Sequence, residues 1–328
     1  MEYACYFGIF EPAGRQRAKI YCAECTSRVF MFQSEPMIEL KIPKLLPRAL
    51  EAHKGSFGHA LLIGGATGMT GAISIAGIAC LRMGAGLVTL GIPQCSHPVV
   101  ASFDPHYMTL PLPCDSAGRL ISDAAIALSP HLMRVSCVAI GPGLGRSDAS
   151  DRIVASFFEN FERPLLVDAD GLNALCESQI WQEVVQGTTS LFNRIRILTP
   201  HPGEWERLCG VSAKDRAGQI AAANELAART KCIVLLKGHQ TLITNGKDSF
   251  INSTGNSSMA VGGSGDCLTG IIAALVCQGM GGLDAARLGA HLHGLAGDIA
   301  HEELGTPSTL AMDLIRYLPD ALRNLGEI

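Results

Sequence analysis

The stretch Ala60–Gly64 (ALLIG) leads directly into the glycine-rich segment Gly64–Gly71 (GGATGMTG), and residues Ala72–Met83 follow with apolar side chains at steps of three to four. A short apolar run that ends in glycine is typical of a buried strand. The spacing in the third segment is typical of a helix that buries one face. Together the three segments predict a strand, a tight turn and a helix, which is the repeating unit of a parallel sheet.

The same alternation continues through the chain. Apolar runs predict strands over Leu87–Gly91, Cys137–Gly141, Leu165–Asp168, Ile195–Leu198 and Ile233–Leu236. Helices are predicted over Asp148–Glu159, Asp170–Gln179, Gly203–Cys209 and Ala213–Thr230. Gln240–Ile251 holds two short β runs around an Asn-Gly pair, a strong hairpin signal, so an antiparallel edge is expected there. The chain is therefore predicted to be a single α/β domain, with a doubly wound, mostly parallel sheet flanked by helices.

Composition limits the classes of function. The chain has 328 residues, of which 48% are hydrophobic and 17% are charged, and its net charge is −4. A nucleic-acid binder usually carries a basic excess, so we expect no nucleic-acid partner. No apolar run approaches ~20 residues, so we expect no membrane partner. The 12 cysteines are scattered, which favours reduced thiols in a cytoplasmic protein.

The beginning of the chain differs from the remainder. Residues 1–36 are rich in Tyr, Phe, Arg and Cys without a clear period, and they lack the basic-then-apolar order of a signal peptide. Cys22 and Cys25 have no second pair of ligands nearby, so we expect no zinc site there. Met37 begins a segment that is typical of a natural start. We therefore divide the chain into an N-terminal extension, 1–36, that is dispensable or disordered, and a folded domain, 37–328.

Polar residues follow several predicted strands at their carboxyl ends. Asp168 and Asp170 follow one strand, Thr199–Glu204 follow the next, and Lys237-Gly238 follow the one after. Ligands bind at this edge of open parallel sheets. The turn Gly64–Gly71 also fits the start of a dinucleotide-binding fold, but no acidic residue ends the following strand. That absence argues against a hydride-transferring dehydrogenase.

The most informative local motif is Gly262-Gly263-Ser264-Gly265-Asp266. Apolar residues at 268, 271, 272, 275 and 276 predict an amphipathic helix directly after it. The glycines therefore lie at a helix N-terminus, where free N–H groups and the helix dipole favour an anion. An Asp at this position could be a helix cap alone. Phosphoryl transfer, however, requires donors for the transferred group and a base for the attacking hydroxyl, and this motif supplies both. We expect a phosphate-handling site with Asp266 as its acid/base.

From about Met37 to its C-terminus, the chain resembles the ADP/ATP-dependent NAD(P)H-hydrate dehydratases of the ribokinase-like superfamily. The resemblance rests on nine motifs in order: His53–Gly58, Gly71-Ala72, Arg82–Val88, Gly141–Gly145, Asp168–Asn173, Thr199–Glu204, Leu236–Gly238 with Thr241, Gly262–Asp266, and His293–Asp298. Each motif is weak alone, but their order across most of the chain is specific. Ser264 stands where many members of the family carry Thr, and we expect little change because both supply a hydroxyl.

The resemblance implies a repair reaction on a nucleotide cofactor. NADH or NADPH that has become hydrated on its nicotinamide ring is phosphorylated on the added hydroxyl, and phosphate then leaves as the ring double bond returns. Phosphate is a far better leaving group than hydroxide. The expected substrates are the (6S) hydrates of NADH and NADPH with ADP or ATP, and Mg²⁺ is the expected cofactor.

The resemblance also assigns roles to residues. Asp266 is expected to remove the proton from the hydrate hydroxyl, and the backbone N–H groups of Gly263, Ser264 and Gly265 are expected to form the anion hole. The expected nucleotide-binding residues are Lys237, Gly238, His239, Gln240, Thr241 and Gly265. The hydrated dinucleotide is expected to contact Ala72, Gly143, His201 and Asp266. Glu204 and Asp168 are the candidates for organising Mg²⁺, although surface or capping roles fit them too.

Other consequences of the resemblance concern partners and alternatives. We expect a cytoplasmic homotetramer that prefers ADP, as bacterial members of the family do. A separate NAD(P)H-hydrate epimerase is expected as a functional partner, because too little chain precedes residue 53 to hold an epimerase domain. Two alternatives remain: a vitamin-pathway kinase of the same fold, of the hydroxyethylthiazole type, and a non-catalytic nucleotide sensor. Arg82–Val88 and Thr199–Glu204 favour the dehydratase over the kinase, and an intact Asp266 argues against a sensor.

Overall fold

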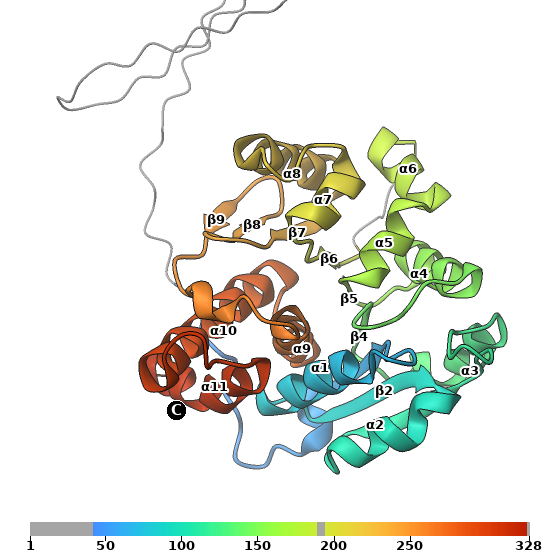
Figure 1. Ribbon diagram of the computed structural model, residues 1–328, viewed down its shortest axis with the longest axis horizontal. Helices are drawn as coiled ribbons and strands as arrows, with labels where there is room; N and C mark the ends of the chain where they lie inside the picture. Colours follow the sequence, from blue (N-terminus) through green and yellow to red (C-terminus); the bar gives the residue numbers. More distant parts are fainter. Residues whose placement is uncertain (1–41, 189–193, 327–328) are drawn as a thin grey trace, which may run out of the picture. The chain divides into compact units, whose positions relative to one another are not determined.

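A nine-stranded sheet runs through residues 42–188 and 194–326, the part of the chain that this computed structural model describes (Figure 1). The strands are β1 (His59–Ile63), β2 (Leu87–Pro93), β3 (Met108–Leu112), β4 (Cys137–Ile140), β5 (Leu165–Val167), β6 (Arg196–Leu198), β7 (Ile233–Leu236), β8 (Leu242–Thr244) and β9 (Ser249–Ile251). They lie in the order β3-β2-β1-β4-β5-β6-β7-β8-β9. Every pair from β3 to β7 is parallel, and β8 and β9 are added antiparallel. The predictions for residues 1–36, including the Cys22/Cys25 pair, lie outside the described residues.

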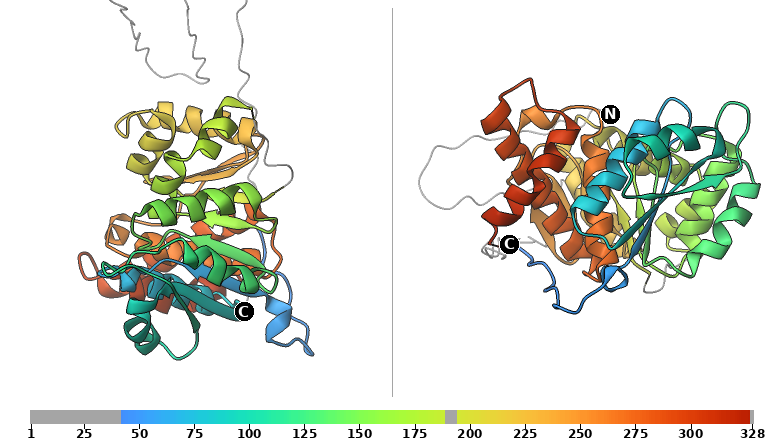
Figure 2. Two further views of the ribbon diagram at one scale, coloured as in Figure 1. Left: turned by 90° about the vertical axis from the view of Figure 1, so that its right-hand side faces the viewer. Right: turned by 90° about the horizontal axis from the view of Figure 1, so that it is seen from below.

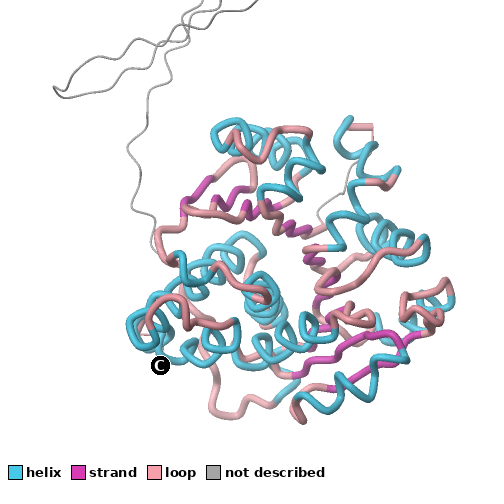
Figure 3. Tube along the Cα trace, in the orientation of Figure 1, coloured by secondary structure: helices cyan, strands magenta, loops and turns pink. Residues whose placement is uncertain are grey.

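Helices cover both faces of the sheet (Figures 2 and 3). One face carries α1 (Thr70–Arg82), α2 (His97–Phe103), α9 (Ser264–Cys277), α10 (Gly282–Leu304) and α11 (Ala311–Asn324). The other carries α3 (Asp123–Leu132), α4 (Asp148–Asn160), α5 (Asp170–Cys176), α6 (Gln179–Gln186), α7 (Pro202–Cys209) and α8 (Arg216–Thr230). Short 3₁₀ turns lie at η1 (Lys54–Phe57), η2 (Gln94–Ser96) and η3 (Ser257–Met259). Within the described ranges, no helix combines the length and the apolar character that crossing a membrane requires.

The core is divided in two by the sheet, because alternate strand residues face opposite sides. On β1, Ala60 and Leu62 pack against α1 and α9, whereas Leu61 and Ile63 pack beneath α3 and α4. All four side chains are fully buried. Burial on both faces explains why β1 is apolar at every position except its first, instead of alternating apolar and polar residues.

The doubly wound, mostly parallel sheet and the antiparallel hairpin predicted from the sequence are confirmed. The pattern did not predict β3, an edge strand that contains Pro111 and leaves Met108 exposed. Proline cannot donate to a sheet ladder and is tolerated at such edges, so β3 lacks an ordinary strand signature. The helix predicted over Asp170–Gln179 is present but ends earlier, at Cys176. Ser178 adopts an extended backbone and caps a new helix by accepting from Trp181 N–H, so α5 and α6 are separate.

The side on which successive strands are added to the sheet changes at β1. From β1 the chain adds β2 and then β3 on one side, whereas β4 to β7 extend the sheet on the other. Such a switch point opens a crevice beyond the carboxyl ends of the two diverging strands. Here the loops after β1 and β4 meet across it, since Gly65 N–H donates to Pro142 O at 3.0 Å and Ala66 N–H donates to Gly143 O at 2.7 Å.

A buried arginine closes the carboxyl end of α4. Arg196, the first residue of β6, has no exposed surface. Its guanidinium donates to carbonyls that include those of Phe158 (2.8 Å) and Phe161 (2.5 Å). The last carbonyls of a helix lack intrahelical donors and carry the negative end of its dipole, so they stabilise a cation there. Burial nevertheless lowers the pKa of Arg196 to about 10.

We expect Arg196→Ala to lower the free energy of unfolding by about 3 kcal/mol or more, because several buried carbonyls would lose their donors. Chemical denaturation measures this quantity. Arg194→Ala is the matched control, since Arg194 is more exposed and donates to Glu159 O at the same helix end. We expect that control to change the stability by less than about 1 kcal/mol. Equal effects of the two substitutions would contradict this role of Arg196.

Candidate active site

A cavity of ≈ 430 Å³ opens at the carboxyl edge of the sheet, at the switch point beside β1 and β4. Its walls come from the loop after β1, the start of α1, the loop after β4, the start of α5, α7 and the start of α9. The lining residues are Met69, Gly71, Ala72, Ile75, Gly143, Ala169, Asp170, Asn173, Glu204, Gly263 and Asp266. Segments far apart in the sequence therefore form one site.

The start of α9 forms one wall of the cavity. Gly263 is the N-cap residue, with φ at 90°, and a Cβ at this position would lie 2.8 Å from Ile75 Cδ1. No side chain caps the helix. Gly265 and Asp266 lie in its first turn, where backbone N–H groups have no intrahelical acceptor. These N–H groups are therefore available to an anion.

Ser264 differs from its neighbours in the predicted anion hole. Its N–H donates to Val261 O at 3.3 Å, so this donor is already engaged within the loop. Its hydroxyl lies 3.4 Å from Nε2 of His293, a buried histidine on α10. Burial lowers the pKa of His293 to about 4, so the ring is neutral at neutral pH.

The pKa of Asp266 is unusually high for a carboxyl group. Burial, and next the charge of Asp168, raise the pKa of Asp266 from 3.8 to about 7. The Lys237 ammonium acts in the opposite direction, and Glu204 adds to the rise. A carboxyl group with a pKa near neutrality can both accept and release a proton at physiological pH, which suits a general base or acid. The prediction that Asp266 is an acid/base gains physical support from this environment.

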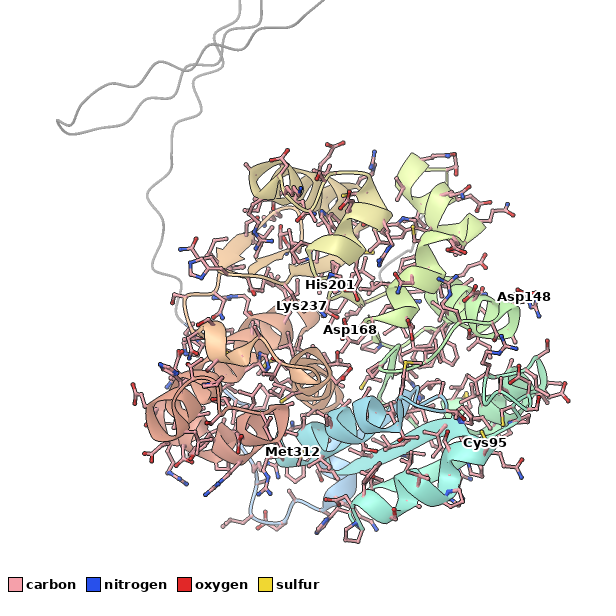
Figure 4. The ribbon with its side chains drawn as sticks, viewed as in Figure 1. Cys95, Asp148, Asp168, His201, Lys237 and Met312 are labelled. Atoms are coloured by element: carbon pink, nitrogen blue, oxygen red, sulfur yellow. The ribbon has the colours of Figure 1, made fainter. Side chains whose placement is uncertain are left out.

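Asp168 and Lys237, which directly follow β5 and β7, form a buried ion pair (Figure 4). The Nζ atom of Lys237 lies 2.8 Å from Asp168 Oδ1. The second carboxylate oxygen of Asp168 accepts from the Thr269 hydroxyl at 2.7 Å. Only 2% of the Asp168 side chain is exposed. Burial acts to lower the pKa of Lys237, but the charges of Asp168 and Glu204 outweigh it and the pKa is raised.

His201 and Glu204 bind each other at the start of α7. His201 Nδ1 accepts from the N–H groups of Gly203 (3.0 Å) and Glu204 (3.2 Å), while Glu204 Oε2 accepts from His201 N–H at 2.8 Å. His201 Nε2 lies 3.2 Å from Glu204 Oε1. This is a reciprocal capping box, completed by Pro202 at the first helical position. Burial lowers the pKa of His201 and raises that of Glu204.

Asp168 and Glu204, the candidates for organising Mg²⁺, are engaged by protein groups in this structure. Asp168 Oδ1 accepts from Lys237 and Oδ2 accepts from Thr269, while Glu204 Oε2 accepts from His201 N–H. Across the ranges 42–188 and 194–326, no group of three His, Cys, Asp or Glu side chains could hold a metal ion. The capping role that also fitted Glu204 is the one that the structure shows.

The turn after β7 lies beyond the cavity lining. It contains Gly238, His239, Gln240 and Thr241, and the Thr241 hydroxyl donates to Gly238 O at 3.0 Å. Arg216 at the start of α8 fixes this turn. Its guanidinium donates to the carbonyls of Lys237 (3.2 Å), Leu236 (3.3 Å) and Gln240 (3.1 Å). Lys237 alone extends from this segment toward α9, since a Cβ on Gly265 would lie 3.3 Å from its Nζ.

Two of the residues that line the cavity, Gly143 and Ala169, have positive φ angles. Gly143 has φ at 57°, and a Cβ there would lie 2.6 Å from Met69 O. Asp170 anchors the same loop, since its Oδ2 accepts from Gly145 N–H at 2.9 Å. Ala169, which also lines the cavity, has φ at 48° although it is not a glycine. Such backbone strain tends to concentrate at functional sites.

The structure brings five of the predicted site residues to one cavity and places two more beside it. Ala72, Gly143, Glu204, Gly263 and Asp266 line the same cavity. His201 and Lys237 adjoin it through Glu204, because Lys237 Nζ lies 4.0 Å from Glu204 Oε2.

The sequence analysis assigned no individual role to several residues of the site: Met69, Ile75, Ala169, Asn173, Thr269 and Arg216. Asp170 was expected at the ligand-binding edge, and Ala169 and Asn173 lie in the motif Asp168–Asn173. Thr269 also had a usable signal, since it lies three residues after Asp266 in the predicted helix and so on the same side.

Comparisons with known proteins agree on one family. The family model described as NAD(P)H-hydrate dehydratase matches residues 60–320. A bifunctional NAD(P)H-hydrate repair enzyme of Moorella thermoacetica is 42% identical over 85% of this chain and 52% of its own length. An ADP-dependent (S)-NAD(P)H-hydrate dehydratase of Neisseria meningitidis is 34% identical over 84% of this chain and 88% of its own. The chain spans about half the length of the bifunctional relatives.

A solved structure supports the same likeness. The ADP/ATP-dependent NAD(P)H-hydrate dehydratase from Bacillus subtilis, co-crystallised with ATP/Mg²⁺, superposes with a TM-score of 0.72 at 28% identity. The alignment covers 86% of this chain and 95% of that one. The ribokinase-like fold predicted from the sequence is thereby confirmed.

We expect Asp266→Asn to stabilise the protein at neutral and alkaline pH. The folded protein holds this proton up to about pH 7, whereas the unfolded chain releases it near 3.8, so the carboxyl reduces stability as the pH rises through that window. Asparagine removes this cost. Because the group is only partly buried, we expect a gain of about 2 kcal/mol near pH 8.

Denaturation of wild type and variant at matched pH values measures the difference. Near pH 4 the two proteins should differ little, since the carboxyl is protonated in the folded wild type. A difference that does not change between pH 4 and pH 8 would contradict a raised pKa of Asp266.

Proposed function

The chain belongs to the NAD(P)H-hydrate dehydratase family, and from that membership we propose that it dehydrates the (6S) hydrates of NADH and NADPH, using ADP or ATP as phosphoryl donor. The name of the Neisseria meningitidis relative, similar over most of both chains, supports the substrate and the preference for ADP. One observation carries the proposal: Asp266, with a pKa of about 7, lies in the first turn of α9 against a cavity of ≈ 430 Å³. A base and several N–H groups that can donate to an anion thus lie on the same wall of the cavity.

In the proposed reaction, Asp266 accepts the proton of the hydroxyl on the hydrated nicotinamide ring. The hydroxyl oxygen attacks the terminal phosphorus of the nucleotide, which releases AMP from ADP or ADP from ATP. The N–H groups of Gly265 and Asp266 lie where they can stabilise the charge on the transferred group. The phosphate ester then breaks at the ring carbon and phosphate leaves, while the adjacent ring carbon loses a proton to solvent, so that the ring double bond returns. The product is NADH or NADPH.

The remaining residues would position the two substrates. The backbone around Gly143 and Ala72 allows close approach of the dinucleotide, since neither residue presents a large side chain to the cavity. The nucleotide phosphates would lie between the start of α9 and Lys237, with the turn Gly238–Thr241 beside them. Mg²⁺ belongs to the proposal as the counterion of those phosphates, supported by the ATP/Mg²⁺ co-crystals of the Bacillus subtilis protein.

The proposal also holds that this protein is a cytoplasmic homotetramer. A separate epimerase would act on the other epimer of the hydrate. Exposed apolar side chains at Val99, Phe103 and Met108, on α2 and the edge strand β3, support self-association. Light scattering coupled to size-exclusion chromatography tests the oligomer. A monomer at all concentrations would remove that part of the proposal.

The direct test is incubation of the protein with NADH hydrate and either ADP or ATP. We expect recovery of reduced-nicotinamide absorbance, together with AMP or ADP and free phosphate. A stable phosphorylated alcohol without recovery of NADH would instead indicate a small-alcohol kinase. Tight nucleotide binding without turnover would indicate a sensor.

We expect Asp266→Asn to lower turnover by about 10²–10⁴-fold, because a positioned general base usually contributes that much. Nucleotide affinity, measured by calorimetry, should remain close to that of the wild type. Asp148→Asn is the matched control, since Asp148 also lies in the first turn of a helix but is exposed and outside the cavity lining (Figure 4). Turnover of the Asp266→Asn variant within about tenfold of the wild type would overturn the base assignment.

The pH profile should report the same group. We expect kcat/KM to rise with pH and to reach half its maximum near 7, as Asp266 becomes ionised. Lys237→Met should move that midpoint to higher pH, because the Lys237 ammonium lowers the pKa of Asp266. Lys237→Arg, which keeps the charge, should leave the midpoint close to that of the wild type. An unchanged midpoint in the Lys237→Met variant would contradict this electrostatic role.

A further inference from the structure

Two cysteines meet at the carboxyl edge of the sheet, away from the Lys237–Asp168 pair (Figure 4). Cys95 lies in η2, directly after β2, and Cys114 follows the neighbouring strand β3. The Sγ atoms are 3.5 Å apart, with the Cys114 thiol donating to Cys95. A disulfide bond is about 2.05 Å long, so the two sulfurs need to approach by about 1.5 Å to form one.

The backbone that follows Cys114 is held in place. Cys114 forms an isolated bridge with Leu120, which closes the turn 115–119. Within it, Asp115 Oδ1 accepts from the N–H groups of Ala117 and Arg119, both at 2.9 Å. Gly118 packs directly on the pair, since a Cβ there would lie 3.1 Å from Cys95 Sγ. The short distance between the thiols is therefore built into the two strand ends.

Thr67 completes the cluster. Its hydroxyl lies 3.4 Å from Cys95 Sγ, and a Cβ on Gly118 would lie 1.9 Å from that hydroxyl oxygen. Thr67 belongs to the loop after β1, which reaches the cavity at Met69. The thiol pair therefore adjoins a loop of the active site without lining the cavity.

The two thiols differ in exposure and acidity. Cys95 is exposed, and the hydrogen bond with Thr67 lowers its pKa. Cys114 is half-buried, and burial raises its pKa. The thiolate is the reactive form of cysteine, so Cys95 is the thiol that reacts first with an oxidant in solution. Five other described cysteines, Cys80, Cys137, Cys232, Cys267 and Cys277, are buried.

We propose that Cys95 and Cys114 form a dithiol site at which small-molecule disulfides of the glutathione class close an intramolecular disulfide. The Cys95 thiolate attacks one sulfur of oxidised glutathione, which forms a mixed disulfide and expels one glutathione thiolate. The Cys114 thiolate then attacks Cys95 Sγ and expels the second. The two protons from the cysteines end on the two glutathione molecules. The protein dithiol is oxidised by two electrons and the glutathione disulfide is reduced.

The sequence makes this modification simple to map. No Lys or Arg occurs between Met83 and Arg119, so both cysteines fall in one tryptic peptide. The full-length protein is incubated with excess oxidised glutathione, free thiols are alkylated, and the digest is analysed by mass spectrometry. We expect most of this peptide to be lighter than the reduced form by two hydrogen atoms, unalkylated, and open to alkylation after reduction.

Single-cysteine variants test the order of attack. In Cys114→Ser the mixed disulfide with glutathione should accumulate on Cys95, whereas in Cys95→Ser the Cys114 thiol should stay mostly unmodified. Cys209→Ser, at a half-buried cysteine in another part of the fold, is the control and should leave closure unchanged. The proposal is overturned if the wild-type peptide is alkylated at both cysteines after exposure to the oxidant. It is also overturned if the wild type stops at the glutathione adduct.

Discussion

The buried ion pair between Lys237 and Asp168 is the interaction on which the site depends. The two residues directly follow β7 and β5, and Thr269 connects the same carboxylate to α9. Two strand ends and one helix are therefore joined at one carboxylate. A charge taken out of water costs several kcal/mol unless it is paired, so neither partner is stable there alone. The pair fixes where the start of α9 lies relative to the strand ends.

The same pair sets the acidity of the reacting group. Burial, Asp168 and Glu204 raise the pKa of Asp266, and Lys237 opposes them. Without this cation, several carboxyl groups would meet in a poorly solvated place and would retain protons. If the positive charge beside Asp266 acted more strongly, the pKa of Asp266 would be lower, and its carboxylate would be a weaker base. A pKa of about 7 is therefore the result of burial and the neighbouring carboxylates acting against the Lys237 ammonium, and not of a single contact.

The sequence predicted what repetition and local chemistry can specify. Apolar strands, glycine turns and the helix after Gly262–Asp266 follow from residue patterns, and the structure has each of them. Residue patterns could not show which charged groups meet across the sheet. Asp168 was thus taken as a metal candidate, although its two oxygens bind Lys237 and Thr269. Such partners lie 69 and 101 residues away in the chain, and no periodicity encodes those distances.

The helix dipole gives the start of α9 an affinity for anions, and it also favours the ionised form of Asp266. The pKa of Asp266 is nevertheless raised, so burial and neighbouring carboxylates outweigh the dipole. A phosphate bound to the same N–H groups adds negative charge beside Asp266 and raises its pKa further. Asp266 can then accept a proton more readily once the phosphoryl donor has bound, provided that Lys237 keeps Asp266 ionised before that. In the proposed reaction, binding of the phosphoryl donor and activation of the attacking hydroxyl would in this way be coupled through one carboxyl group.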